Sequence, residues 1–223
     1  MSLRLPVALA AIAVGLVGLA LNFAGISGTM VASAANPEPR SFAGFLVFYW
    51  SFLTNLSNTA LLLVYIADLT GARGLGWFRH PVTKTGLAGI MMLVMTFYHF
   101  MLQPTLPPDI PQTIHVSNVL LHYATPILFL LWWAAFSGHG TLRYRDVPMM
   151  LVPGLLYVLY IQLRGPLVGE YPYTILDPGY APPGGAAGGF LGVGISVAVL
   201  VVLVALFDLL LVFADGLMAR RKS

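Results

Sequence analysis

A hydroxyl and an imidazole lie within two long apolar stretches of this chain, where polar side chains are unfavourable. Thr54 begins the polar run Thr54-Asn55-Leu56-Ser57-Asn58-Thr59, and His122 lies deep in the second stretch. Polar groups in apolar stretches of membrane-spanning length suggest a functional site. A threonine hydroxyl next to a histidine supports nucleophilic catalysis, because the imidazole can take the hydroxyl proton. These residue types are therefore candidates for catalysis inside a membrane, provided that both lie at one depth.

Each stretch also carries a stripe of polar side chains at helical spacing. The stripes contain Ser51, Thr54, Asn55 and Asn58 in the first stretch and His115, Asn118 and His122 in the second. Spacings of three and four place side chains on one face of a helix, and such a face normally points into a bundle. The candidates for substrate binding or oxyanion stabilisation are Ser51, Asn55, Asn58 and Asn118. Ser51, Ser57 and Thr59 are also suited to hydrogen-bonded packing between helices.

The segment that follows the fifth apolar stretch is rich in aromatic and turn-forming residues. It contains the runs Glu170-Tyr171-Pro172-Tyr173 and Asp177-Pro178-Gly179. These runs fit either an aromatic belt that ends in a turn or a cap over an outward-facing pocket. Tyr171, Tyr173 and Asp177 are therefore further candidates for substrate binding.

The composition is that of an integral membrane protein. Of 223 residues, 58% are hydrophobic and 9% are charged, and the mean hydropathy is +0.85. An average soluble protein is about half apolar and about a quarter charged. The absence of cysteine excludes disulfides, thiolate metal sites and a cysteine nucleophile. A net charge of +3 does not call for a nucleic-acid partner. We expect one membrane domain over residues 1–223.

Six apolar segments are long enough to cross a bilayer. They cover about 5–26, 44–69, 82–103, 114–136, 147–163 and 187–214. With a cytoplasmic N-terminus, nine basic residues lie inside and only Arg40 and Arg164 lie outside, which satisfies the positive-inside rule. The first segment is too long for a signal peptide, so we expect it to remain uncleaved. The predicted fold is an all-α polytopic protein with six transmembrane helices and both termini in the cytoplasm.

This topology places the two candidate catalytic residues at similar depths. Thr54 comes ten residues after Gly44, or about 15 Å below the outer surface at the helical rise per residue. His122 comes eight residues after Ile114, or about 12 Å below it. Because the two segments run in the same direction, contact between the side chains is permitted. The ionisable residues Asp68, Asp208 and Asp215 are expected to be interfacial anchors or to have local partners.

Three patches resemble the androgen-induced family of transmembrane threonine hydrolases, and the bacterial six-span members are the most similar. They are Phe52-Leu53-Thr54-Asn55-Leu56-Ser57-Asn58, Leu121-His122-Tyr123-Ala124-Thr125-Pro126, and the loop from Tyr171-Pro172-Tyr173 to Leu176-Asp177. The resemblance implies hydrolysis of fatty acid esters of hydroxy fatty acids by a membrane-embedded threonine and histidine, which match Thr54 and His122. It also implies a bacterial inner (plasma) membrane. Asn55-Leu56-Ser57-Asn58 differs from the corresponding pattern of the animal members.

Three functional hypotheses follow. The first is a lipid-ester hydrolase in which His122 activates Thr54, with no cofactor, metal or protein partner, and a membrane lipid or lipid ester as substrate. The second is a non-catalytic lipid-binding or transport protein whose polar cavity recognises a headgroup. The third is a metal-dependent hydrolase in which His99, His115 and His122 hold a metal ion that activates water.

Overall fold

The structure is a computed structural model that describes residues 3–32, 38–180 and 188–220. Every regular element in these ranges is helical, which confirms the all-α prediction. Five helical segments are long and apolar enough to cross a membrane, and a bent pair raises the number to six if it counts as one span.

The six predicted segments all correspond to helical segments within the described residues, although three of them contain several elements. The elements are α1 (Arg4–Ile26), α2 (Phe42–Tyr49), α3 (Leu53–Thr70), α4 (Gly76–Arg79), α5 (Pro81–Phe97), α6 (Gln112–Val119), α7 (Thr125–Phe136), α8 (Val147–Val168) and α9 (Gly189–Arg220). Two π-helical segments, Tyr98–Leu102 and Leu120–Ala124, continue α5 and join α6 to α7. Short 3-10 turns cover Ser27–Met30, Arg73–Leu75, Gln103–Thr105, Tyr144–Asp146 and Thr174–Leu176.

The last two helices are longer than predicted because charged residues are accommodated within them. The predicted end of the fifth segment at Leu163 is followed by Arg164, yet α8 continues to Val168. Arg164 is buried and its guanidinium bonds to Glu170, so its charge does not end the helix. Similarly, α9 passes through the buried Asp215 and ends at Arg220.

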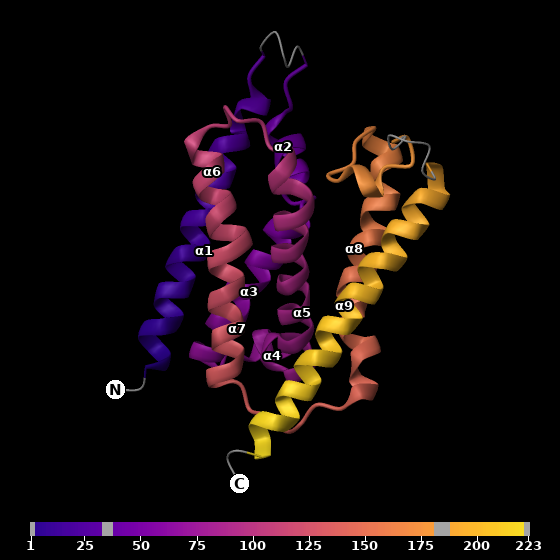
Figure 1. Ribbon diagram of the computed structural model, residues 1–223. Helices are drawn as coiled ribbons and strands as arrows, with labels where there is room; N and C mark the ends of the chain where they lie inside the picture. The colour runs from indigo at the N-terminus through magenta and orange to yellow at the C-terminus, as the bar shows by residue number, and fades with distance from the viewer. Residues whose placement is uncertain (1–2, 33–37, 181–187, 221–223) are drawn as a thin grey trace.

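The helices form one bundle with α5 at its centre (Figure 1). α5 packs against α3, α7, α8 and α9, while α1 lies along α3, α6 and α7. α9 crosses the bundle obliquely and pairs with both α8 and α5. The first turn of α1 and the last turn of α9 lie at the same end of the bundle, and α2 lies towards the opposite end (Figure 1).

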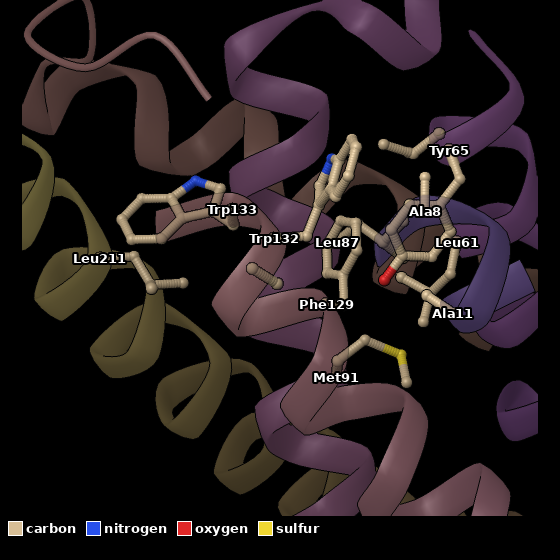
Figure 2. Packing of buried hydrophobic residues seen from close by; sticks show 12 residues of the cluster. Ala8, Ala11, Leu61, Tyr65, Leu87, Met91, Phe129, Trp132, Trp133 and Leu211 are labelled. Atoms are coloured by element: carbon tan, nitrogen blue, oxygen red, sulfur yellow. The ribbon is translucent and has the colours of Figure 1, made fainter. Parts of the chain in front are cut away.

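A core of aromatic and aliphatic side chains joins the helices that carry the two candidate catalytic residues (Figure 2). Tyr65 of α3 makes edge contacts with Phe129 and Trp132 of α7, with ring centroids 5.9 and 5.2 Å apart. Ala8 and Ala11 of α1 are fully or almost fully buried in the same cluster. Small side chains let α1 approach closely, as is common in membrane bundles. The core therefore fixes α3 relative to α7.

Two of the three predicted acidic anchors have local partners. Asp68 accepts hydrogen bonds from Lys84 Nζ at 2.6 Å and from the Trp132 indole nitrogen at 3.1 Å. Asp215 pairs with His139 Nδ1 at 2.9 Å. Buried carboxylates need such partners, so the prediction of a local partner is confirmed for these two residues.

Asp208 departs from this pattern. Its side chain is fully buried on α9, and neither carboxyl oxygen has a hydrogen-bond partner among the described residues. The carboxyl group lies against α5 at Gly89, where a Cβ atom would be only 2.1 Å from Asp208 Oδ1. The expectation of an interfacial anchor or a partnered carboxylate is therefore wrong for Asp208. The missing side chain at Gly89 makes room for it.

Gly89→Ala is expected to destabilise the protein by about 1–3 kcal/mol, because an added methyl group would overlap the Asp208 carboxyl. The measurement is the thermal unfolding midpoint in detergent, for which we expect a clear decrease. The double variant Gly89→Ala/Asp208→Ala should recover most of the loss, since the overlapping atoms are removed. Gly194→Ala is the control, because a Cβ there meets no atom within 4 Å. If Gly89→Ala lowered the unfolding midpoint equally in the wild-type and Asp208→Ala backgrounds, the steric explanation would be contradicted.

Candidate active site

The second predicted segment is broken, and the break puts Thr54 in the first turn of a helix. α2 ends at Tyr49, α3 begins at Leu53, and the two helices are bent by 78°. The prediction of one continuous helix over 44–69 is therefore wrong. Ser51 lies in the break and does not share a helical face with Thr54, contrary to the predicted stripe.

Side chains satisfy the backbone carbonyls that the break leaves free. Asn55 Nδ2 donates to the Tyr49 carbonyl at 2.9 Å, and Tyr157 Oη donates to the Ser51 carbonyl at 2.9 Å. The Ser51 hydroxyl donates back to the Val47 carbonyl. Within a membrane an irregular backbone is tolerated only where such partners exist. Asn55 and Tyr157 therefore stabilise the conformation that presents Thr54.

The break also leaves backbone donors beside Thr54. The first N–H groups of a helix have no carbonyl partner within it, and the Phe52 side chain does not cap α3. The N–H groups of Leu53 and Thr54 lie near the hydroxyl oxygen of Tyr173. Two amide donors and the Thr54 side chain thus converge on one small region.

His122 lies in a π-helical segment, where the backbone hydrogen bonds reach one residue further than in an α-helix. The N–H of Thr125 bonds to the Leu120 carbonyl, five residues back. Pro126 explains this local change, because a proline ring collides with the carbonyl four residues earlier, here that of His122. Pro104 likewise comes two residues after the end of the other π segment, Tyr98–Leu102. Single π turns are frequent at functional sites.

The π turn frees a carbonyl that ties the histidine segment to α3. The Leu121 carbonyl accepts hydrogen bonds from Asn58 Nδ2 and Thr125 Oγ1, both at 3.2 Å. Asn58 Nδ2 also donates to the Thr54 carbonyl at 2.8 Å. Asn58 thereby connects the backbones beside Thr54 and His122. Its predicted contact with substrate or oxyanion stays a prediction.

Thr54 and His122 are in direct contact. Thr54 Oγ1 is 3.2 Å from His122 Nε2, and His122 Nδ1 is 3.0 Å from the Asn118 carbonyl oxygen. A carbonyl oxygen can only accept, so Nδ1 carries the proton and Nε2 has the free lone pair. The hydroxyl of Thr54 therefore donates to Nε2. This is the arrangement in which a neutral imidazole can act as a general base.

Tyr98 holds the imidazole plane from one side. Its ring stacks on His122 with centroids 4.0 Å apart and an interplanar angle of 19°. On the ring edge, the Asn118 carbonyl positions the histidine through Nδ1. Since the two π segments face each other here, Pro104 and Pro126 both shape the histidine environment.

The loop between α8 and α9 is anchored next to the site. Glu170 pairs with Arg40 and lies 3.2 Å from the Arg164 guanidinium. Gln162 Nε2 donates to the Leu176 carbonyl at 2.7 Å. These bonds hold the described part of the loop on the end of α8. One of these charged anchors, Arg164, is itself buried.

Tyr173 is the loop residue that reaches Thr54. Its ring makes edge contacts with Phe52 and Phe97, with centroids 5.9 and 6.1 Å apart, and its hydroxyl lies near the Thr54 side chain. Burial raises the pKa of Tyr173, while the nearby polar groups of Thr54 and Leu53 oppose that rise. The phenol therefore keeps its proton and can donate. Of the two interpretations of this loop, the cap is the one that agrees with these contacts.

Other candidates have contacts of a structural kind. The Tyr171 ring lies over Gly165, and Asp177 Oδ1 accepts from the Gly179 N–H at 2.7 Å, closing a turn. Ser57 and Thr59 each bond to a carbonyl of their own helix. These interactions stabilise the helix and the loop, and they do not bring Tyr171 or Asp177 to the Thr54–His122 pair.

The proposed histidine metal site is not formed. His99 Nδ1 bonds to Tyr123 Oη at 2.9 Å, His115 is exposed, and both ring nitrogens of His122 have other partners. Within the ranges that the structure describes, no three histidine, aspartate, glutamate or cysteine side chains are grouped as metal ligands. The alternative that assigned His99, His115 and His122 to one metal ion is therefore wrong.

Two residues of the site were missed by the sequence analysis. Tyr98 and Tyr157 belong to long apolar helices, and nothing in their local pattern distinguishes them from interfacial or core tyrosines. Pro126, four residues after His122, was a usable signal of irregular backbone at the histidine. No comparable signal exists for Tyr157, whose partner carbonyl at Ser51 lies 106 residues away in sequence.

An apolar cavity opens beside the pair, between α5, α8 and α9. Thr54, His122, Tyr157 and Tyr173 are the polar side chains of its lining, and the remaining walls are almost entirely aliphatic. A nucleophile and base at the edge of such a cavity can meet an ester whose hydrocarbon part lies within it.

Comparison with known proteins adds no relative: no protein-family model, curated protein or solved structure matches this chain.

Proposed function

We propose that this protein is an intramembrane lipid-ester hydrolase in which Thr54 is the nucleophile and His122 the general base. The observation that carries the proposal is the 3.2 Å hydrogen bond from Thr54 Oγ1 to His122 Nε2, with the tautomer set by the Asn118 carbonyl. Two helix N–H groups and an apolar cavity lie beside that bond. Nucleophile, base, oxyanion donors and a place for substrate are thus within one small region.

In the first half-reaction, His122 Nε2 takes the hydroxyl proton as Thr54 Oγ1 attacks the ester carbonyl carbon. The carbonyl oxygen becomes negative in the tetrahedral intermediate. Hydrogen bonds from the Leu53 and Thr54 N–H groups and from Tyr173 Oη stabilise that oxygen. His122 then gives its proton to the alkoxy oxygen, the carbon–oxygen bond breaks, and the alcohol leaves an acyl-threonine.

In the second half-reaction, water takes the place of the alcohol. His122 Nε2 removes a proton from the water as the water oxygen attacks the acyl carbon. The second tetrahedral intermediate uses the same donors. Its collapse returns the proton from Nε2 to Thr54 Oγ1 and releases the carboxylic acid, so the enzyme is regenerated.

The membrane setting belongs to this proposal. We propose six spans, both termini in the cytoplasm and a site in the outer half of a bacterial inner membrane. The distribution of basic residues between the segments supports this topology, and so does the position of the first turn of α1 and the last turn of α9 at one end of the bundle (Figure 1). The resemblance to the androgen-induced family adds fatty acid esters of hydroxy fatty acids as substrates. A bilayer-embedded site suits an ester whose chains already partition into lipid.

Labelling with a fluorophosphonate probe tests the proposal directly. In purified protein in detergent, the probe should attach covalently to Thr54, identified by mass spectrometry of the labelled peptide, and labelling should be lost in Thr54→Ala. Thr59→Ala is the matched control, since its hydroxyl bonds only to the Asn55 carbonyl of its own helix, and it should label like wild type. Lipid binding without label or turnover would instead favour the non-catalytic lipid-binding hypothesis and overturn this one.

A further inference from the structure

We propose that the cavity beside Thr54 holds the acyl chain that is transferred to the threonine, and that Gly154 sets the length of chain it accepts. This inference rests on the proposed hydrolase function and extends it to the class of acyl group. It follows from the direction of the cavity, the distribution of polar side chains along it and the space at Gly154.

The cavity runs along α8 and α9 away from the catalytic pair. At one end, Tyr157 and Val197 cluster with Leu53 and Tyr173 beside the pair. At the other end lie Met150 and Val204. Seven residues separate the two ends on each helix, which corresponds to about 10 Å at the helical rise. An extended chain of about eight carbons fits this length.

The polarity of the lining changes along the cavity. The polar lining residues Thr54, His122, Tyr157 and Tyr173 are associated with the catalytic end, and aliphatic side chains of α5, α8 and α9 form the rest. A hydroxyl or charge further along the chain would lose its hydrogen bonds to water without gaining others. The cavity therefore selects an unsubstituted hydrocarbon chain, and the polar portion of the ester remains on the alcohol side.

On the α9 side, the far end of the cavity is closed by contact between α5 and α9. Asp208 lies one turn beyond Val204 and packs against Gly89 with no exposed surface. This close contact leaves no path for the chain past Val204 along α9. On that side, it limits how far the chain can extend.

Gly154 lies between the two ends and is the point where the cavity can be shortened. It lines the cavity, and a Cβ atom there would meet no other atom within 4 Å. A larger side chain at this position can therefore enter the cavity without displacing its neighbours. Gly154→Leu should leave room for a short acyl chain and exclude a long one.

The test compares hydrolysis of p-nitrophenyl esters from acetate to palmitate. Wild type should show its highest kcat/KM near eight to ten carbons, in line with about 10 Å of cavity. Gly154→Leu should lower kcat/KM for decanoate relative to that for acetate by about tenfold or more, because the loss lies in chain contacts alone. Gly194→Leu, which adds the same side chain at an exposed position of α9 with no atom within 4 Å, should match wild type.

An unchanged chain-length profile in Gly154→Leu would overturn the inference while leaving the hydrolase intact. Photo-crosslinking tests the chain pocket independently of ester hydrolysis. Decanoic acid carrying a diazirine on its terminal carbons should label peptides containing Met150 or Val204 in wild type and in Thr54→Ala, and much less in Gly154→Leu. Labelling there without turnover of any ester would support the chain pocket and reject the hydrolase. Labelling elsewhere, equal in all variants, would reject the pocket.

Discussion

Thr54→Ala and His122→Ala should each reduce ester hydrolysis by at least about 10⁴-fold, and the double variant should be little worse than either. Alanine at position 54 removes the attacking oxygen. Alanine at position 122 leaves the hydroxyl without the base that lies 3.2 Å away in the native protein. Because the two residues act as one unit, their losses are not additive. The measurement is kcat/KM on p-nitrophenyl octanoate for both single variants and the double variant.

The controls separate chemistry from folding. Thr54→Ser keeps a hydroxyl at the same place and should retain measurable activity, whereas Thr59→Ala should stay within about twofold of wild type because its hydroxyl serves only local packing. Unchanged thermal unfolding midpoints would show that the variants are folded. Independent losses that multiply in the double variant would contradict a nucleophile–base pair.

Tyr173→Phe should lower kcat by about 10²–10³-fold and change KM by less than about threefold. The substitution removes only the hydroxyl that lies with the Thr54 and Leu53 N–H groups at the site, and it leaves the ring between Phe52 and Phe97. A donor to the oxyanion acts in the transition state, so its removal affects kcat more than ground-state binding. Steady-state kinetics over a full range of ester concentrations resolves the two constants.

Tyr171→Phe is the matched control for this prediction. It removes a hydroxyl from the same loop, two residues earlier, from a ring that lies over Gly165. Wild-type kinetics are expected. If Tyr173→Phe raised KM and left kcat unchanged, Tyr173 would bind the substrate and would not stabilise the transition state.

The helices could be predicted because their length and apolar character depend on local hydrophobicity and on the charged residues between the segments. These are properties of the bilayer as a solvent, and they are encoded in each segment separately. The contact between Thr54 and His122 agrees with the predicted depths. The break before Leu53 could not be predicted in the same way, because neither glycine nor proline occurs in Trp50-Ser51-Phe52.

That break depends on partners that are distant in the chain. Tyr157 supplies the hydrogen bond to the Ser51 carbonyl from a helix more than a hundred residues away. Tyr173 reaches the first turn of α3 from a loop whose position is fixed by ion pairs with Arg40 and Arg164. Such tertiary bonds leave no periodic pattern in the sequence. Pro126 is the exception, because its effect on the His122 backbone is local.

The Asn118 carbonyl behind His122 has a consequence for the charge of the site. Many hydrolases place a carboxylate in that position, but here the partner is uncharged, and the cavity lining contains no Asp, Glu, Lys or Arg. The resting site therefore has zero formal charge, and the intermediate of the proposed reaction would pair one imidazolium with one oxyanion. A buried net charge would be unfavourable at membrane depth. Turnover should accordingly be almost independent of ionic strength and of the voltage across the membrane.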